Sequence, residues 1–282
     1  MGEIIKGAPA AKALTEELTA RADALKAKGV TPTLAILRVG ERGDDIAYEN
    51  GALKRCEKIG IEVKRFLLPA DASKADVLSA IEEINTDKGI HGCLMFRPLP
   101  DKETENEAAA ALLPAKDSDC MTKGSLAAVF AGGGDGFAPC TAEAVITILK
   151  HYGVDLTGKK VAVVGRSLVI GKPVSMLLQK ENATVTMCHT RTKDLAGETK
   201  RADIIVACAG KAKMIGPEHV SEGQVIIDVG INVDADGNMC GDVDTDAVLD
   251  TVSMITPVPG GVGTVTTSVL AKHVIEAAEK TL

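Results

Sequence analysis

The chain has 282 residues, 45% hydrophobic and 25% charged, which is enough for two domains or one large one. A net charge of -7 argues against a nucleic-acid partner bound through a broad basic surface, and no apolar run is long enough to span a bilayer. Seven cysteines without a CxxC pair, and an N-terminus with early charges and no apolar signal core, predict a cytoplasmic protein with neither a metal site nor disulfide bonds.

The first half of the chain alternates two kinds of pattern. Segments that mix polar and apolar residues at a 3.6-residue period predict helices, and short β-rich apolar runs predict strands. In chain order this gives a helix at 8–28, a strand at 33–39, a helix at 46–59, a strand at 62–68, a helix at 73–85, a strand at 91–96 and a helix at 104–112. The short connections favour βαβ units and a parallel sheet.

A glycine-rich stretch, AGGGDGFAPC at 131–140, predicts a domain boundary. A helix at 141–152 then leads into a second α/β series, with strands at 160–165, 184–189, 203–210 and 224–230. A loop rich in proline and glycine at 257–263 precedes a long final helix. The whole chain is therefore expected to be of the α/β class.

The segment VAVVGRSLVIGKPVS, residues 161–175, is typical of a phosphate-binding turn. An apolar strand ends at Gly165 and a helix is predicted to begin near Gly171. Glycines let the backbone approach a phosphate, and a helix N-terminus favours negative charge. The spacing differs from G-x-G-x-x-G, so a tight turn without a ligand fits as well.

Charged and hydroxyl side chains beside this turn bear on the choice of nucleotide. Arg166 and Ser167 suit a 2′-phosphate and so favour NADP over NAD. Thr190 and Arg191 follow the next strand, where the adenosine ribose is expected, and fit the same preference. The alternative is that both arginines are solvated surface charges.

Two further loops are candidate ligand sites. TPVPGGVGTVT, at 256–266, predicts a stiff loop that either presses against a flat ligand or forms an irregular helix entry. PAKDSDC, at 114–120, carries Asp117 and Asp119. Such aspartates either cap turns or accept hydrogen bonds from a ring with adjacent donors.

Taken together and in this order, these segments resemble the methylenetetrahydrofolate dehydrogenase/cyclohydrolase family. The similarity runs roughly from Thr33 to Ala278, and its most specific segment is TPVPGGVG at 256–263. The other matching segments are PCTAEAV (139–145), GRSLVIGKP (165–173), IDVGIN (227–232), GDV (241–243) and RPLP (97–100).

The resemblance implies two α/β domains with a cleft between them. Residues 1–138, joined by a C-terminal helix at 265–282, would form the tetrahydrofolate-binding catalytic domain, and residues 139–264 a Rossmann-type NAD(P)-binding domain. It also implies a homodimer. The implied reactions are oxidation of 5,10-methylenetetrahydrofolate with NADP, NAD being possible, and hydrolysis of the methenyl product to 10-formyltetrahydrofolate.

The resemblance also implies roles for particular residues. Tyr48 and Asp119 would be catalytic, with Tyr48 stacking on the folate and Asp119 hydrogen-bonding the pterin. The other implied folate contacts are Pro98, Leu99, Pro257, Gly260 and Gly261, and we expect Phe96 to add an apolar contact to the folate ring. The implied cofactor-binding residues are Gly165, Arg166, Ser167, Gly171, Pro173, His189, Thr190, Arg191, Ala209, Gly210, Ile231 and Thr266.

The chain departs from the family pattern at two informative positions. The family has Lys four residues after the tyrosine, where this chain has Ala52, and Gln two residues before Pro-Leu-Pro, where it has Phe96. Hydride transfer mainly requires positioning, whereas hydrolysis requires a polar group that activates water. We therefore predict a dehydrogenase whose cyclohydrolase activity is weak or lost.

Three alternatives stay open. Arg97, otherwise a surface salt-bridge residue, would stabilise a developing charge in a fully bifunctional enzyme, although a guanidinium is a poor base. A degenerate paralogue would bind folate or nucleotide without turnover. A two-domain dehydrogenase would act on a different small substrate.

Overall fold

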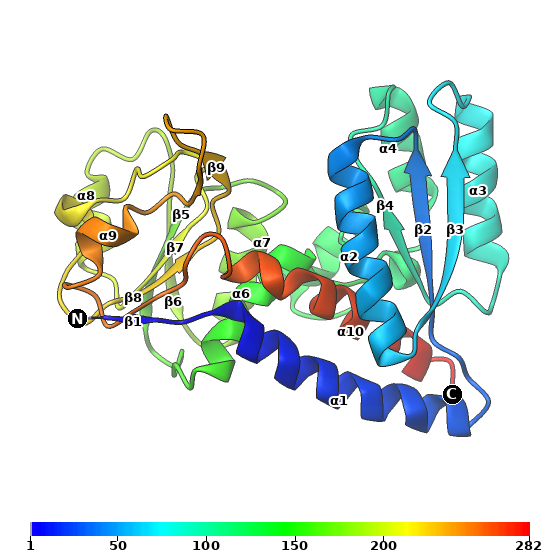
Figure 1. Cartoon of the computed structure of the whole chain (residues 1–282), viewed down its shortest axis with the longest axis horizontal. Coiled ribbons are helices and arrows are strands. Elements are labelled where there is room, and N and C mark those ends of the chain that lie inside the picture. Colours follow the sequence, from blue (N-terminus) through cyan, green and yellow to red (C-terminus); the bar gives the residue numbers. More distant parts are fainter. Residues whose placement is uncertain (1) are drawn as a thin grey trace. The chain divides into compact units, whose positions relative to one another are not determined.

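The structure, a computed structural model, describes residues 2–282. It divides into two compact units (Figure 1). The six-stranded unit comprises the residues up to Lys12 and Thr141–Thr266, and the three-stranded unit comprises Ala13–Cys140 and Thr267–Leu282. Helices α1 (Gly7–Ala27) and α10 (Thr266–Glu279) each contribute residues to both units.

The three-stranded unit is built on a parallel sheet in the order β3-β2-β4. Its strands are β2 (Thr33–Val39), β3 (Glu62–Leu68) and β4 (Gly92–Met95). Every residue of β2 is buried, as expected for a central strand that is covered on both faces. The predictions of strands at 33–39 and 62–68 are confirmed to the residue.

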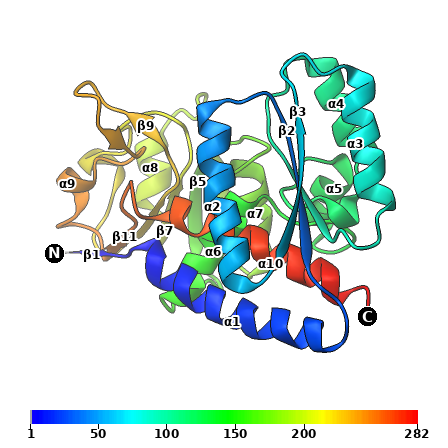
Figure 2. The same cartoon turned by 45° about the vertical axis from the view of Figure 1, so that its right-hand side comes forward.

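Helices cover both faces of this sheet. Figure 2 shows α2 (Gly43–Ile59) on one face, with α3 (Lys74–Thr86) and α4 (Lys102–Ala111) on the other. Alternate residues of β2, namely Ala35, Leu37 and Val39, pack into one apolar cluster with residues of α3 and α4. The 3₁₀ turn η1 (Pro114–Lys116) and helix α5 (Lys123–Ala131) follow.

One face of α2 is buried along its whole length. Its buried positions are Asp45, Glu49, Ala52, Cys56 and Ile59, a spacing of three or four residues that marks a single helix face. Two of these five residues are acidic. The helix is therefore held by charged contacts as well as by apolar packing.

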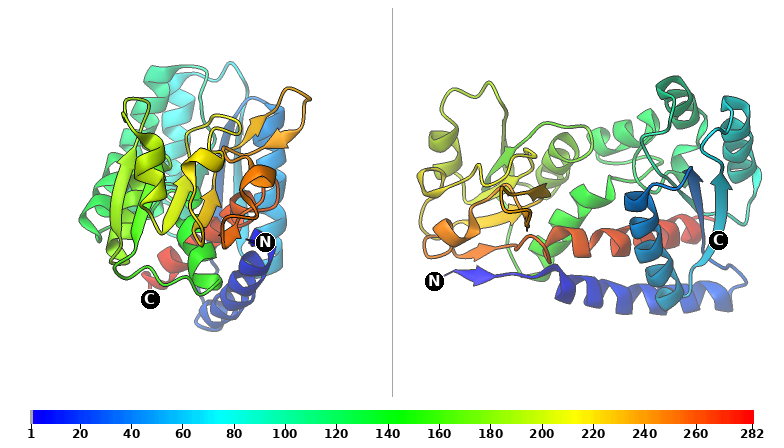
Figure 3. Two further views of the ribbon diagram at one scale, coloured as in Figure 1. Left: turned by 90° about the vertical axis from the view of Figure 1, so that its left-hand side faces the viewer. Right: turned by 45° about the horizontal axis from the view of Figure 1, so that its top comes forward.

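The six-stranded unit is a parallel sheet in the order β1-β11-β8-β7-β5-β6 (Figure 3). Its strands are β1 (Glu3–Ile4), β11 (Met254–Ile255), β8 (Val225–Asp228), β7 (Ile204–Ala207), β5 (Lys160–Val164) and β6 (Thr184–Cys188). The α/β fold class and the parallel second series are confirmed.

Shorter elements complete the six-stranded unit. Its helices are α6 (Cys140–His151), α7 (Gly171–Lys180), α8 (Leu195–Lys200) and α9 (Thr245–Val248), with 3₁₀ turns η2 (Pro217–His219) and η3 (Val262–Thr264). Strands β9 (Asn232–Val233) and β10 (Met239–Cys240) form an antiparallel hairpin. Within residues 2–282, no helix has both the length and the apolar character needed to cross a membrane.

The first residues of the chain lie in a different unit from the one we expected. Because Glu3 and Ile4 pair with Met254 and Ile255, the N-terminal segment belongs to the six-stranded unit, whereas the sequence assigned it to the catalytic domain. A strand of two residues leaves no periodic pattern that a sequence could reveal. The assignment of folate binding to 1–138 and nucleotide binding to 139–264 stays a prediction.

Candidate functional site

A cavity of about 320 Å³ opens where β5, β6 and β7 end in the six-stranded unit. Carboxyl ends of parallel strands are the usual place for ligands in such sheets, and the volume is within the range of ligand sites. The cavity is lined by Val164, Gly165, Arg166, Ser167, His189, Thr190, Thr192, Leu195, Cys208, Ala209 and Met214.

The turn from β5 to α7 requires both of its glycines. Gly165 has φ +140°, and a Cβ there would overlap the backbone of Cys208. A Cβ on Gly171 would overlap the carbonyl of Gly165, so the first turn of α7 packs directly on the end of β5. Ser167 Oγ accepts the backbone N–H of Ile170 at 3.1 Å. The turn is thus a compact, open backbone at the N-terminus of a helix.

The loop after β6 forms the opposite wall of the cavity. His189 donates its backbone N–H to Thr192 Oγ1 at 2.9 Å, and its Nδ1 accepts the backbone N–H of Arg191 at 3.1 Å. Arg166 and Arg191 are both exposed. Two cations therefore flank the loops on which a phosphate-bearing ligand is expected.

Six of the residues predicted from the sequence to bind the cofactor line this cavity together: Gly165, Arg166, Ser167, His189, Thr190 and Ala209. Gly171 and Pro173 lie in the first turn of α7, beside the lining residues. The remaining predicted residues, Arg191, Gly210, Ile231 and Thr266, are outside the lining.

Sequence reasoning missed Cys208, Leu195 and Met214 in the same cavity. Burial raises the pKa of Cys208 to about 12, and the charge of Asp242 acts in the same direction. The side chain is therefore a neutral thiol near pH 7, and it adds no negative charge beside a phosphate site.

In the three-stranded unit, Tyr48 and Phe96 come together from different elements. Tyr48 lies on α2, Phe96 directly follows β4, and their ring centroids are 6.0 Å apart at an interplanar angle of 81°. This edge-to-face geometry is favourable for two aromatic rings. Ala52, one turn after Tyr48, is 0% exposed. The two predicted aromatic contacts thus form one surface, and Ala52 lies in the packed seam beneath α2.

The RPLP segment continues from Phe96. Arg97 and Pro98 are exposed and joined by a cis peptide bond, whereas Leu99 is buried and donates its N–H to Glu105 Oε2 at 2.9 Å. Within residues 2–282, no acidic oxygen lies within 4 Å of the Arg97 guanidinium, so the alternative of a surface salt bridge is not realised in this structure. Its charge nevertheless acts on Asp119 and Glu105.

The two aspartates of the PAKDSDC loop have different roles. Asp117 is fully buried and accepts the N–H groups of Met121 and Thr122 at 3.0 and 2.8 Å, which makes it a turn residue. Asp119 is half-buried, and its Oδ1 accepts the N–H of Cys140 at 2.9 Å. Burial raises the pKa of Asp119, against the opposing effects of Cys140 and then Arg97.

An ion cluster centred on the buried carboxylate of Glu49 lies next to Tyr48 and Phe96, and the sequence analysis did not identify it. Arg38 on β2 and Arg65 on β3 donate their Nε–H groups to Glu49 at 2.8 and 2.7 Å. Glu49 immediately follows Tyr48, and the N–H of Phe96 bonds to Leu37, the neighbour of Arg38. The sequence signal for this cluster was Arg38, a charged residue within the otherwise apolar strand TLAILRV. Since an unpaired buried charge is costly, this cluster fixes α2 on the sheet.

The proline-glycine loop belongs to the six-stranded unit. Gly260 has φ +101° and its carbonyl accepts the N–H of Gly7 at 2.9 Å. Gly261 is buried, and its carbonyl accepts Thr264 Oγ1 at 2.7 Å. Pro257 precedes the cis peptide bond between Val258 and Pro259. The loop is a defined backbone structure that leads into η3.

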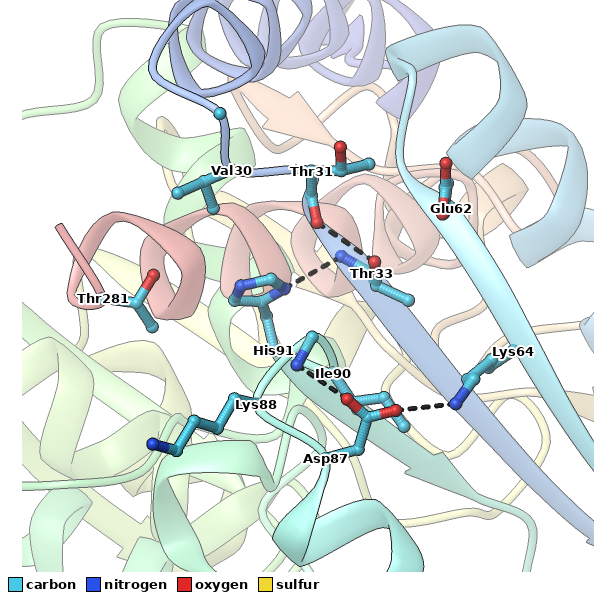
Figure 4. Close-up of a pocket in the computed structure, with 12 residues that line it drawn as sticks. Val30, Thr31, Thr33, Glu62, Lys64, Asp87, Lys88, Ile90, His91 and Thr281 are labelled. Atoms are coloured by element: carbon cyan, nitrogen blue, oxygen red, sulfur yellow. Dashed lines mark hydrogen bonds and ion pairs between the residues drawn. The ribbon is translucent and has the colours of Figure 1, made fainter.

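A second cavity, of about 430 Å³, lies at the amino ends of β2, β3 and β4 (Figure 4). His91 points its Nδ1 at the backbone N–H of Thr33, 3.2 Å away, and Asp87 pairs with Lys64 at 2.6 Å. Its walls carry both positive and negative side chains. They lie at the amino ends of the strands, whereas Phe96 follows the carboxyl end of β4. In the described part of the chain, no cluster of three potential metal ligands is present.

Comparison with family models gives two matches that together cover most of the chain. Residues 5–119 match the model "Tetrahydrofolate dehydrogenase/cyclohydrolase, catalytic domain". Residues 139–282 match the model "Tetrahydrofolate dehydrogenase/cyclohydrolase, NAD(P)-binding domain".

The similarity to individual relatives extends over nearly the whole chain. The bifunctional protein FolD of Clostridioides difficile is 53% identical over 99% of this chain and 97% of its own length. The crystal structure of the bifunctional enzyme FolD from Campylobacter jejuni has a TM-score of 0.94, 34% identity and full coverage of both chains. The Trypanosoma brucei enzyme, complexed with NADP and an inhibitor, has a TM-score of 0.90, 32% identity and coverage of 99% and 98%.

Proposed function

Because this chain belongs to the tetrahydrofolate dehydrogenase/cyclohydrolase family, we propose that it oxidises 5,10-methylenetetrahydrofolate with NADP and hydrolyses the methenyl product to 10-formyltetrahydrofolate. The observation that carries the dehydrogenase is the open glycine turn at the edge of a 320 Å³ cavity. The bifunctional relative with 53% identity supports the second reaction.

The residues of the cavity fit a dinucleotide. The backbone between Gly165 and Gly171 can approach a pyrophosphate at the N-terminus of α7. The exposed cations Arg166 and Arg191 favour the extra 2′-phosphate of NADP. When bound, NADP supplies the hydride acceptor.

Most of the proposed folate contacts belong to the three-stranded unit. The aromatic surface of Tyr48 and Phe96 suits a pterin ring, with Pro98 and Leu99 beside it. Asp119 accepts N–H donors from the ring, and its main-chain anchor at Cys140 fixes the carboxylate in place. In the six-stranded unit, Pro257, Gly260 and Gly261 offer a further, rigid backbone surface. Hydride transfer then requires only that the donor carbon is held in position.

Hydrolysis requires more from the protein than positioning. Water must lose a proton as it adds to the cationic methenyl carbon, and a nitrogen of the neutral tetrahedral adduct must gain one as its C–N bond breaks. We assign this proton transfer to the Tyr48 hydroxyl. We assign an electrostatic role to Arg97, because a nearby cation disfavours the cationic substrate relative to the neutral adduct, and its guanidinium has no acidic partner within 4 Å in residues 2–282. We also propose a homodimer, which light scattering of the purified protein would test.

A second candidate function is a dehydrogenase with weak or absent cyclohydrolase activity. One observation favours it: Ala52 and Phe96 occupy the positions of the family's lysine and glutamine, and Ala52 is 0% exposed. A methyl group cannot activate water.

Two assays on the purified chain separate the candidates. The first follows NADPH formation from methylenetetrahydrofolate, and the second follows decay of methenyltetrahydrofolate above the uncatalysed rate. Activity in both assays is expected. Dehydrogenation alone would establish the second candidate. No activity in either assay would indicate a binding paralogue or an enzyme that acts on a different substrate.

A further inference from the structure

Two buried carboxylates in the six-stranded unit have no role in the site described so far. Asp228 ends β8 within the segment IDVGIN, and Asp242 lies within GDV. They are 1% and 0% exposed. Since buried carboxylates are costly unless they are fully hydrogen-bonded, the donors around them reveal what they hold in place.

The two segments fit together through their glycines. A Cβ on Gly230 would overlap the carboxylate of Asp242, and a Cβ on Gly241 would overlap the carboxylate of Asp228. Asp-Val-Gly in one segment therefore packs against Gly-Asp-Val in the other. Each glycine leaves the space that the other segment's aspartate fills.

Asp228 holds the backbone of the GDV segment. Its Oδ1 accepts the N–H groups of Gly230 and Asp242, both at 3.0 Å, and its Oδ2 accepts that of Val243 at 2.9 Å. Burial raises the pKa of Asp228 to about 6, against these hydrogen bonds and together with the charge of Asp242. The donors thus offset only part of the cost of burying this carboxylate.

Asp242 in turn holds the loop that follows β7. Its Oδ2 accepts the N–H groups of Ala209 and Gly210 at 2.6 and 3.0 Å, and its Oδ1 accepts that of Lys211 at 2.8 Å. Asn232 Nδ2 adds a fourth donor at 2.9 Å. Successive backbone N–H groups of this kind form an anion-binding nest, which here is filled by a side chain of the protein itself.

This nest is part of the wall of the cofactor cavity. Cys208, Ala209 and Met214 line the cavity, and the chain between them is the segment that Asp242 binds. The same segment is fixed at its far end, where Lys213 donates to the carbonyl of Gly241 and Ile215 to that of Asp242, at 3.1 and 2.9 Å. The shape of the wall therefore depends on Asp242.

We propose that Asp242 is a positioning residue for the dinucleotide, which shapes the Ala209–Met214 wall of the cofactor cavity while Asp228 holds it in place. This inference rests on the proposed function, because it takes the cavity as the NADP site. Asp242 touches no reacting atom and acts through the backbone of Ala209, Gly210 and Lys211.

The test compares the full-length wild type with Asp242→Asn and with the control Asp236→Asn, an exposed carboxylate in the β9–β10 hairpin. Asparagine offers one acceptor oxygen where four N–H groups converge, so the dissociation constant of NADPH should rise roughly tenfold. The KM for methylenetetrahydrofolate and the control's NADPH affinity should stay within about twofold. Circular dichroism verifies that each variant is folded.

An unchanged NADPH affinity in folded Asp242→Asn would overturn the inference, as would an equal rise in both substrate constants. If that variant does not fold, Asn232→Ala decides, because it removes the side-chain donor to Oδ1 and so lets the Asp242 carboxylate shift within the nest. A smaller rise in the NADPH dissociation constant is then expected, and an NADPH affinity equal to that of the wild type would overturn the proposal. A wild type that does not bind NADPH would overturn the proposed function first, and this inference with it.

Discussion

The candidate cofactor site in the six-stranded unit and the candidate folate site in the three-stranded unit differ in how many of their expected residues are present. In the six-stranded unit, six predicted residues line one cavity, and both glycines of the turn are required by close backbone contacts. In the three-stranded unit, the aromatic surface of Tyr48 and Phe96 is formed, but Ala52 and Phe96 stand where the family resemblance leads one to expect a lysine and a glutamine.

This difference separates the requirements of the two reactions. Under the proposed function, the six-stranded unit offers a cavity and a glycine turn for the nucleotide, whereas proton transfer in hydrolysis depends on Tyr48 alone, with the exposed Arg97 as an added charge. Because hydride transfer depends on geometry and hydrolysis on titratable groups, one family fold can keep the first reaction while the second changes. The predictions below test each side of this contrast.

The largest effect is expected at the glycine turn. Gly165→Ala places a methyl group against the backbone of Cys208 at φ +140°, so NADPH affinity and dehydrogenase kcat/KM should each fall by about 100-fold. Calorimetric titration with NADPH measures the first and steady-state kinetics the second. Gly43→Ala, where nothing lies within 4 Å of the added Cβ, is the control. A variant that still binds NADPH normally would rule out this turn as the phosphate site.

A smaller and selective effect is expected at Arg97. If its charge disfavours the cationic substrate relative to the neutral tetrahedral adduct, Arg97→Met should slow methenyltetrahydrofolate hydrolysis by about tenfold and leave dehydrogenation within about threefold. Lys58→Met, an exposed cation in the last turn of α2, should change neither rate. Equal losses in both assays would show that Arg97 serves folate binding in general rather than hydrolysis.

The sequence predicted what local patterns encode. Strands 33–39 and 62–68 were correct because apolar runs between helical segments mark a parallel sheet, and the glycine turn was recognised from its strand-to-helix position. Contacts between distant segments were not predictable. Asp242 binds a loop some thirty residues away in the chain, Glu49 joins two strands, and β1 pairs with a strand near residue 254. Helix α5 was missed because its apolar residues lack a one-sided period.

Introducing the expected lysine and glutamine at positions 52 and 96 tests whether these positions limit hydrolysis. The double variant Ala52→Lys, Phe96→Gln should raise hydrolysis relative to dehydrogenation by roughly threefold to tenfold, because it supplies a titratable group beside Tyr48. It should also lower Tm, since position 52 is 0% exposed and the lysine must displace packed atoms. The two assays and a thermal melt measure these effects. An unchanged activity ratio in a folded variant would show that hydrolysis here does not depend on these positions.

The smallest expected effect concerns His91, which immediately precedes β4 at the amino end of the strand. Burial lowers the pKa of His91, and the charge of Lys116 acts in the same direction. Its Nδ1 accepts the N–H of Thr33, a bond that requires the unprotonated nitrogen. A histidine whose pKa is lower when folded stabilises the fold above the unfolded value of about 6.5, and this contribution is lost as pH falls below it. The free energy of unfolding should therefore decline more from about pH 7.5 to about pH 5.5 in the wild type than in His91→Gln, whose amide oxygen can accept the same N–H. A proton NMR titration of His91 with a midpoint at or above 6.5 would contradict this assignment, because the bond to Thr33 would then not hold the ring in its neutral form.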